Sequence, residues 1–175
     1  MISHSYRHCA VELDALPARI GQIRRIVSAQ LRHWQLDPLI DRAALGVTEL
    51  LSNVHRHAQP DKTCAVDMVL RGGLLTVSVR DHDPRLPEVR QADPLETGGR
   101  GLALVAAMSQ AWGVRPWDGA GTGPRTGTPG KLVWFTLTTA AGPDPAGPPI
   151  VLHTETVPVG EAVRTEPAVP EALPA

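Results

Sequence analysis

The amino-acid sequence predicts an α/β protein, a two-layer sandwich with three helices on one face of a mixed, mainly antiparallel sheet. Three observations favour this class. Three segments show helical spacing of apolar residues and five resemble strands, in the order β-α-α-β-β-α-β-β. The pair Gly72-Gly73 is typical of a tight hairpin between neighbouring strands. The chain of 175 residues is 42% hydrophobic, which is enough for the core of one ordinary domain.

The first strand and the first helix are predicted from the N-terminal region. Residues 8–13 alternate between apolar and other residues and predict a short strand. Pro17 suits the first turn of a helix, whose apolar stripe continues at helical spacing to Leu31. Arginines off this stripe form either a solvated face or a surface for an acidic partner: Arg19, Arg24 and Arg25.

A second helix, from about Pro38 to Ala58, carries the strongest pattern. Its apolar stripe comprises Ile40, Ala43, Ala44, Val47, Leu51, Val54 and Ala58. At about 100° per residue, Glu49, Asn53 and His57 stand one above another on a different side. Glu can act as a general base and Asn can give Mg²⁺ an oxygen ligand. Taken alone, however, a Glu-x-x-x-Asn pattern is more typical of a solvated helix face.

Two strands, residues 63–70 and 74–81, follow the proline that ends the second helix. In the later strand Leu75, Val77 and Val79 share the parity that should face the core, and Asp81 continues it. A buried carboxylate is costly unless it has a hydrogen-bond partner or a ligand. Acids also occur at solvated sheet rims, so both interpretations of Asp81 stay open.

An irregular stretch, residues 82–97, separates these strands from a third helix. Structureless loops of this length within compact domains are typical of lids or binding loops. The glycine-rich run 98–101 then opens a buried helix over residues 102–108. Backbone N–H groups at such a helix start can bind phosphate. A flexible hinge before a core helix explains the glycines about equally well.

The C-terminal part of the chain contains two more strands and a tail. Residues 111–117 and 131–137 read as strands, joined by a connection rich in glycine and proline. From residue 140 onward prolines accumulate and acids outnumber the single Arg164. We therefore expect one domain over residues 1–139 and a disordered Pro-rich acidic tail over 140–175.

Composition narrows the class of protein. The sequence has no apolar run long enough for a signal peptide or a bilayer span, which predicts a cytoplasmic protein without membrane contact. Cys9 and Cys64 form neither a disulfide framework nor a zinc-ligand cluster, so reduced core thiols are expected. A formal net charge of -1 disfavours direct nucleic-acid binding.

Three motifs stand in the order found in one known family. Glu49 to Ala58, Asp81-His82-Asp83-Pro84 and Gly98-Gly99-Arg100-Gly101-Leu102-x-Leu104 resemble the three boxes of the GHKL (Bergerat) ATP-binding fold. Gyrase, heat-shock chaperones, histidine kinases and mismatch-repair proteins share this histidine-kinase-like ATPase fold. Within it, residues 130–135 resemble the last strand of bacterial anti-sigma-factor serine/threonine kinases. The resemblance covers about residues 8–139, and the combination is specific although each motif alone is weak.

By this resemblance Glu49 is the general base, Asn53 is the Mg²⁺ ligand and Asp81 accepts the adenine amino group. The implied nucleotide-binding set also includes His57, Gly99, Arg100, Gly101 and Leu102. The family usually has glycine where this chain has Asp83, and a carboxylate beside a polyphosphate is expected to weaken ATP affinity. A metal cluster of His82 and Asp83 beside Asp81 is disfavoured, because neighbouring side chains on an extended chain diverge.

The resemblance implies a serine/threonine kinase that uses ATP and Mg²⁺, sequesters a sigma factor and phosphorylates an anti-sigma-factor antagonist protein. It is also compatible with a homodimer. We expect neither the phosphoacceptor hairpin of sensor histidine kinases nor the transducer domain of gyrase-like and chaperone ATPases in so short a chain. Two alternatives stay open: a non-catalytic ATP-dependent protein-binding module, and a scaffold that has lost nucleotide binding through Asp83.

Overall fold

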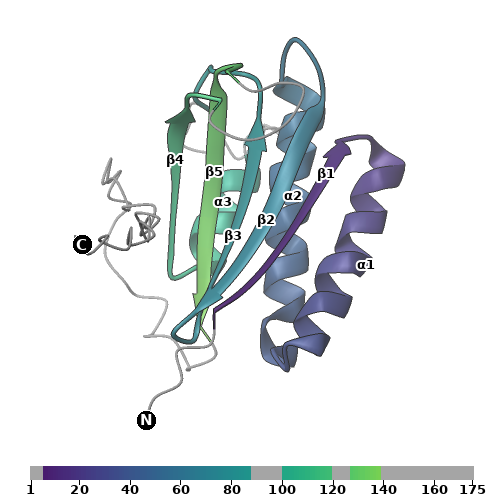
Figure 1. Ribbon diagram of the computed structural model, residues 1–175, viewed down its shortest axis with the longest axis vertical. Coiled ribbons are helices and arrows are strands. Elements are labelled where there is room, and N and C mark those ends of the chain that lie inside the picture. The colour runs from purple at the N-terminus through teal and green to yellow at the C-terminus, as the bar shows by residue number, and fades with distance from the viewer. Residues whose placement is uncertain (1–5, 88–99, 120–126, 139–175) are drawn as a thin grey trace, which may run out of the picture.

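The computed structural model describes residues 6–87, 100–119 and 127–138, which form a sheet with helices packed on one face (Figure 1). The strands are β1 (Arg7–Asp14), β2 (Thr63–Arg71), β3 (Leu74–Asp81), β4 (Ala111–Trp117) and β5 (Gly130–Thr138). The helices are α1 (Pro17–His33), α2 (Ile40–His57) and α3 (Arg100–Met108), with a 3₁₀ turn, η1 (Asp37–Leu39), before α2. The predicted α/β fold with three helices is confirmed.

The sheet has the strand order β1-β2-β3-β5-β4, and all four described pairings are antiparallel. The last strand therefore lies between β3 and β4. The β2–β3 hairpin turns at Gly72 and Gly73, whose φ angles of 57° and 81° lie in the left-handed region that glycine adopts without strain. Because β5 pairs with β3, Lys131 at the start of β5 stands opposite Asp81 at the end of β3.

The core lies between the inner face of the sheet and the helices. The apolar stripe predicted for α2 faces this core, and Ile40 at the first turn is the member that stays partly exposed. Gly46 and Leu50 of the same helix are also buried. The inner row of β3, which comprises Leu75, Val77 and Val79, is at most 1% exposed, as its alternation predicts. Helix α2 is thus fixed against the sheet, and its Glu49 side is left partly exposed.

Gly46 allows the closest approach of α2 to its neighbours. A Cβ added there would lie 2.5 Å from both Cε of Met108 and Cζ of Phe135, which are nearer than side chains tolerate. We expect Gly46→Ala to lower the free energy of unfolding by about 1–3 kcal/mol, because overpacking outweighs the gain in helix propensity. Chemical denaturation monitored by circular dichroism measures this change.

Gly21 in α1 supplies the matched control, since a Cβ added there would meet nothing within 4 Å. Gly21→Ala should stabilise the domain by about 0.4–1 kcal/mol, because the unfolded chain loses freedom and no contact is disturbed. Equal stability changes for the two variants would contradict the close packing at Gly46.

Several predictions fall on residues outside the described ranges. These are most of the long loop, Gly98 and Gly99 of the glycine run, and the tail from residue 140 onward. Within the described ranges, the helices lack the length and apolar character needed to traverse a bilayer. Cys9 and Cys64 are both free thiols.

Candidate functional site

The side of α2 that carries Glu49 and Asn53 meets the start of α3. Both side chains are partly buried. A Cβ added at Gly101 would lie 2.7 Å from Oε2 of Glu49 and 3.7 Å from Nδ2 of Asn53. Glycine at position 101 therefore lets the α3 backbone approach this carboxylate and this carboxamide. The structure thus brings together residues of the first and third motifs, which are about fifty positions apart in the sequence.

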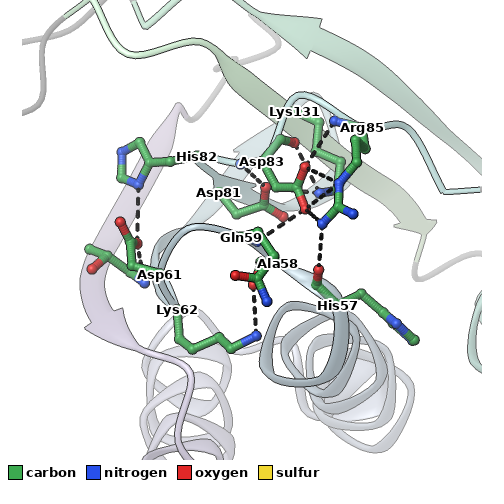
Figure 2. A network of polar contacts seen from close by, with 11 residues as sticks. His57, Ala58, Gln59, Asp61, Lys62, Asp81, His82, Asp83, Arg85 and Lys131 are labelled. Carbon is green, nitrogen blue, oxygen red and sulfur yellow. Dashed lines mark hydrogen bonds and ion pairs between the residues drawn. The ribbon is translucent and has the colours of Figure 1, made fainter.

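The remaining residues predicted around this side occupy different environments. Arg100 opens α3 and is exposed, whereas Leu102 is 8% exposed and belongs to the hydrophobic core. The Leu102 side chain is therefore a packing group, and its backbone N–H is what it can offer to a ligand. His57 is exposed in the last turn of α2, and Figure 2 shows its ring pointing away from the polar network nearby.

That polar network lies where β3 ends, and Asp81 is its buried centre (Figure 2). Asp81 is 2% exposed, and its Oδ1 accepts hydrogen bonds from the backbone N–H of Asp83 and from Nζ of Lys131, both at 2.9 Å. Lys131 also donates to the carbonyl of Asp83 at 3.1 Å. The carboxylate on the core-facing parity of β3 therefore has an ion-pair partner on the neighbouring strand.

Burial raises the pKa of Asp81, and the hydrogen bond from Lys131 opposes that rise. Burial and the nearby Asp81 charge also raise the pKa of the Cys64 thiol, to about 12. Cys64 stands directly opposite Asp81 on β2. The Cys64 thiol is therefore neutral at physiological pH, and the charged groups at this rim of the sheet are the carboxylates and Lys131.

Asp83 connects the segment after β3 to the end of α2. Its buried carboxylate accepts a hydrogen bond from the backbone N–H of Gln59 at 3.1 Å. Nε and Nη2 of Arg85 also donate to it, the latter at 2.7 Å, and Nη2 donates again to the carbonyl of His57. The expected effect of Asp83 on ATP affinity stays a prediction. In the structure Arg85 pairs with its charge, and the carboxylate holds the chain in place.

Asp83→Asn should reveal this anchoring role through the pH dependence of stability. The hydrogen bond from Arg85 is the main cause that holds the pKa of Asp83 well below its ordinary range. A depressed pKa stabilises the fold above the unfolded-state pKa of about 3.9, and this contribution is lost as pH falls towards the folded value. We therefore expect the variant to lose about 1–3 kcal/mol at pH 7, since a buried charged acceptor is removed.

The difference between wild type and Asp83→Asn should shrink below about pH 4, because the unfolded wild-type chain then takes up a proton at Asp83 that the folded protein does not yet bind. Denaturation series at several pH values measure the difference. Glu12→Gln, at an exposed position of β1, is the matched loss of a carboxylate and should cost much less. A deficit for Asp83→Asn that stays constant down to the lowest pH would contradict a charged anchor.

Gly130 completes the packing around Asp81 from the β5 side. A Cβ at position 130 would overlap the backbone carbonyl of Asp81 and would lie 3.0 Å from Cα of His82. The dipeptide Gly130-Lys131 thus has two separate roles, because glycine permits the close approach and lysine supplies the charge. The end of β3 is therefore held from both sides, by β5 and by the end of α2.

Sequence reasoning missed the partners of the two acids. Lys131 shares its parity with Val133, Phe135 and Leu137, so a lysine on the core-facing row of β5 was the available signal. The same rule had singled out Asp81. Arg85 follows Asp83 by two residues, a spacing that allows a local pair but does not predict one. No pattern in the sequence predicts the hydrogen bond that the Gln59 backbone N–H donates to Asp83.

The side chains beside Gly101 can be tested for their fit to a magnesium ion that arrives with a ligand. Within the described residues, His, Cys, Asp and Glu side chains form no group of three or more that could hold a metal ion by themselves. Mg²⁺ commonly takes one or two protein oxygens and completes its shell with water and substrate phosphates. The Asn53 carboxamide, whose Nδ2 is the atom found near Gly101, also carries an oxygen that could serve as such a ligand, so the residue types fit a metal that arrives with a phosphate ligand.

Comparison with known families identifies the class of protein that this fold and these motifs define. Residues 13–123 match the histidine kinase-like ATPase domain, and the chain belongs to this family. It is therefore a member of the GHKL superfamily of ATP-binding domains, a class with ATP-dependent kinase or ATPase activity. The matched segment contains Glu49, Asn53, Asp81 and Gly101, whereas Lys131 lies beyond it. Among curated proteins, no sequence matches the chain.

Proposed function

We propose that this domain binds ATP with Mg²⁺ and acts as a serine/threonine kinase that switches a transcription regulator. In this proposal it sequesters a sigma factor and phosphorylates a protein antagonist in the cytoplasm. The approach of Gly101 to Glu49 and Asn53 carries the proposal, because it gathers a base, a metal ligand and a helix start at one place. The likeness of residues 130–135 to the anti-sigma kinases supports the choice of partner.

The proposed roles follow from the chemistry of each group. The start of α3 offers backbone N–H groups and partial positive charge to phosphate oxygens. Asn53 would hold Mg²⁺, which would supply positive charge to offset the negative charge of the phosphates. Buried Asp81 accepts a hydrogen bond from the adenine amino group. These roles use one face of α2, the N-terminus of α3 and the end of β3.

Transfer in this proposal takes place between the γ-phosphate and a hydroxyl of the antagonist protein. The hydroxyl oxygen forms a bond to the γ-phosphorus, its proton passes to the Glu49 carboxylate, and the bond to the β-phosphate oxygen breaks to leave ADP. A positioned glutamate carboxylate is a group that can accept such a proton as a general base. The protein contributes mainly positioning and electrostatic stabilisation.

The scaffold alternative depends on repulsion by Asp83, and the ion pair of Asp83 with Arg85 weighs against such repulsion. Asp83 is 3% exposed and paired with Arg85, so its charge is directed at the protein. A non-catalytic ATP-dependent binding module uses the same binding residues as the kinase. The two functions differ in whether phosphate reaches a partner, and that difference is measurable.

The test uses the full chain as bait in an extract of its source cell, with and without Mg-ATP. Captured proteins are identified by mass spectrometry, and ATP labelled at the γ-phosphate reports transfer to serine or threonine. The kinase proposal expects a sigma factor among the partners and label on a second protein. ATP-dependent capture with no labelled protein would favour the binding module, and failure to bind ATP at all would contradict both.

A further inference from the structure

Lys131 is a buried cation that has no role in the proposed function. It is 9% exposed at the start of β5, on the core-facing row, directly opposite Asp81. Buried lysines are uncommon unless they are paired, because the charge must leave water. Its two contacts, Oδ1 of Asp81 and the carbonyl of Asp83, satisfy the charge but do not use all of its hydrogen-bonding capacity.

Neither Lys131 nor Asp81 uses all of its hydrogen-bonding groups within the described residues. An ammonium has three N–H donors, and among the described residues Lys131 meets two acceptors. Oδ1 of Asp81 already accepts from Lys131 and from the Asp83 backbone, whereas no donor in the described part of the chain reaches Oδ2. The pair thus has one donor and one acceptor that no described residue uses.

We propose that Lys131 is a base-recognition residue, which donates to the ring nitrogen N1 of adenine while Asp81 accepts from the adjacent 6-amino group. This inference rests on the proposed nucleotide function. The edge of adenine presents an acceptor beside a donor, which complements the donor and acceptor of this pair. Pairing with Lys131 also occupies Oδ1 of Asp81, so that a ligand donor is directed to Oδ2.

The ion pair also affects the protonation of Asp81. A carboxylate only accepts hydrogen bonds, whereas a protonated carboxyl can also donate one. Burial alone favours the protonated form of Asp81, which would place a donor against the adenine amino group. The ammonium of Lys131 opposes this change, whereas the Asp83 charge favours it. The neutral Cys64 thiol on β2 adds no charge. Lys131 therefore favours the acceptor form of Asp81 as well as supplying a donor.

Nucleotide analogues test the inference on the wild-type protein, by calorimetry with Mg²⁺ present. In 1-deaza-ATP a C–H replaces N1, so the analogue cannot accept from Lys131, and we expect its affinity to be roughly 10- to 100-fold below that of ATP. Purine riboside triphosphate lacks the amino group read by Asp81 and should be weakened by a similar factor. Equal binding of ATP and 1-deaza-ATP would overturn the role of Lys131, and GTP binding as tight as that of ATP would overturn the assigned orientation.

The variant Lys131→Met should bind ATP roughly 10- to 100-fold more weakly than wild type and should no longer distinguish ATP from 1-deaza-ATP. Lys62→Met is the matched control, because Lys62 is the only other lysine and its ammonium donates to the Ala58 carbonyl at the end of α2. This control should keep the preference for ATP. Tighter ATP binding by Lys131→Met would overturn the inference, since it would mean that the lysine obstructs the base.

The two experiments separate this inference from the proposed function. Wild type that binds ATP and 1-deaza-ATP equally well supports nucleotide binding but overturns the assignment of Lys131. Wild type that binds no nucleotide overturns both. If Lys131→Met does not fold, the analogue series on wild type still decides, because it changes the ligand and leaves the protein intact.

Discussion

Replacing Asn53 with alanine should remove the Mg²⁺-dependent part of ATP binding and abolish phosphoryl transfer with it. Asn53 is partly buried on α2, and its carboxamide faces the glycine start of α3. A metal held by one protein oxygen and by phosphates loses its attachment to the protein when that oxygen is removed. Since changes in groups that merely support a metal ligand cost about 10- to 100-fold in affinity, loss of the ligand itself should cost at least as much.

Nucleotide affinity with Mg²⁺ and with a chelator measures the Asn53 effect. Asn53→Ala should bind ATP equally weakly under both conditions, whereas wild type should bind more tightly with the metal. Ser52→Ala is the matched control, because it changes the neighbouring residue of the same helix, about 100° around the axis. If Asn53→Ala keeps its magnesium dependence, another group holds the metal.

The fold was predictable because each element carries its own period. The alternating row of β3 and the apolar stripe of α2 specify which side faces the core, whatever their neighbours are. Element ends were less predictable. The 3₁₀ turn η1 at Asp37–Leu39 precedes α2, which begins only at Ile40, and α1 continues to His33. Terminal hydrogen bonds depend on local geometry that the apolar pattern does not encode.

The candidate site was predictable in its chemistry but not in its partners. Asp81 could be singled out because a carboxylate on a buried parity requires an explanation. Its partner Lys131 became evident only from the strand order, which places β5 beside β3 and so sets the two residues opposite each other. Pairings between strands distant in the sequence depend on topology, and a single strand's alternation contains no information about it.

Asp83 shows that the contacts of a substituted motif residue are not evident from the sequence. The expected repulsion assumed that the carboxylate points towards the ligand. In the structure, hydrogen bonds from Gln59 and Arg85 turn it towards the end of α2. A glycine at this position would lack these bonds. Glycine would give the backbone more freedom here, whereas Asp83 gives it side-chain hydrogen bonds. The segment after β3 is therefore held by contacts that glycine cannot make.

Glu49→Gln should separate chemistry from binding, because the amide keeps the shape of the side chain but is a far weaker base. Oε2 of Glu49 lies 2.7 Å from the place that a Cβ at Gly101 would occupy, so the group stands beside the start of α3. If Glu49 takes the proton of the attacking hydroxyl, the variant should bind Mg-ATP about as well as wild type. Its turnover should fall by about 10²- to 10⁴-fold, the usual contribution of a positioned general base.

Calorimetry with Mg-ATP and transfer of labelled phosphate to the captured antagonist protein measure the two quantities on one preparation of Glu49→Gln. Asp41→Asn is the matched control, since it makes the same kind of change at an exposed position in the first turn of α2 and should leave transfer unaltered. A selective loss of turnover in Glu49→Gln would assign the base to Glu49. Together with the Asn53→Ala result, it would place the base and the metal ligand on successive turns of α2. Wild-type transfer by Glu49→Gln would mean that Glu49 is not the base, because a neutral amide cannot accept the proton at neutral pH.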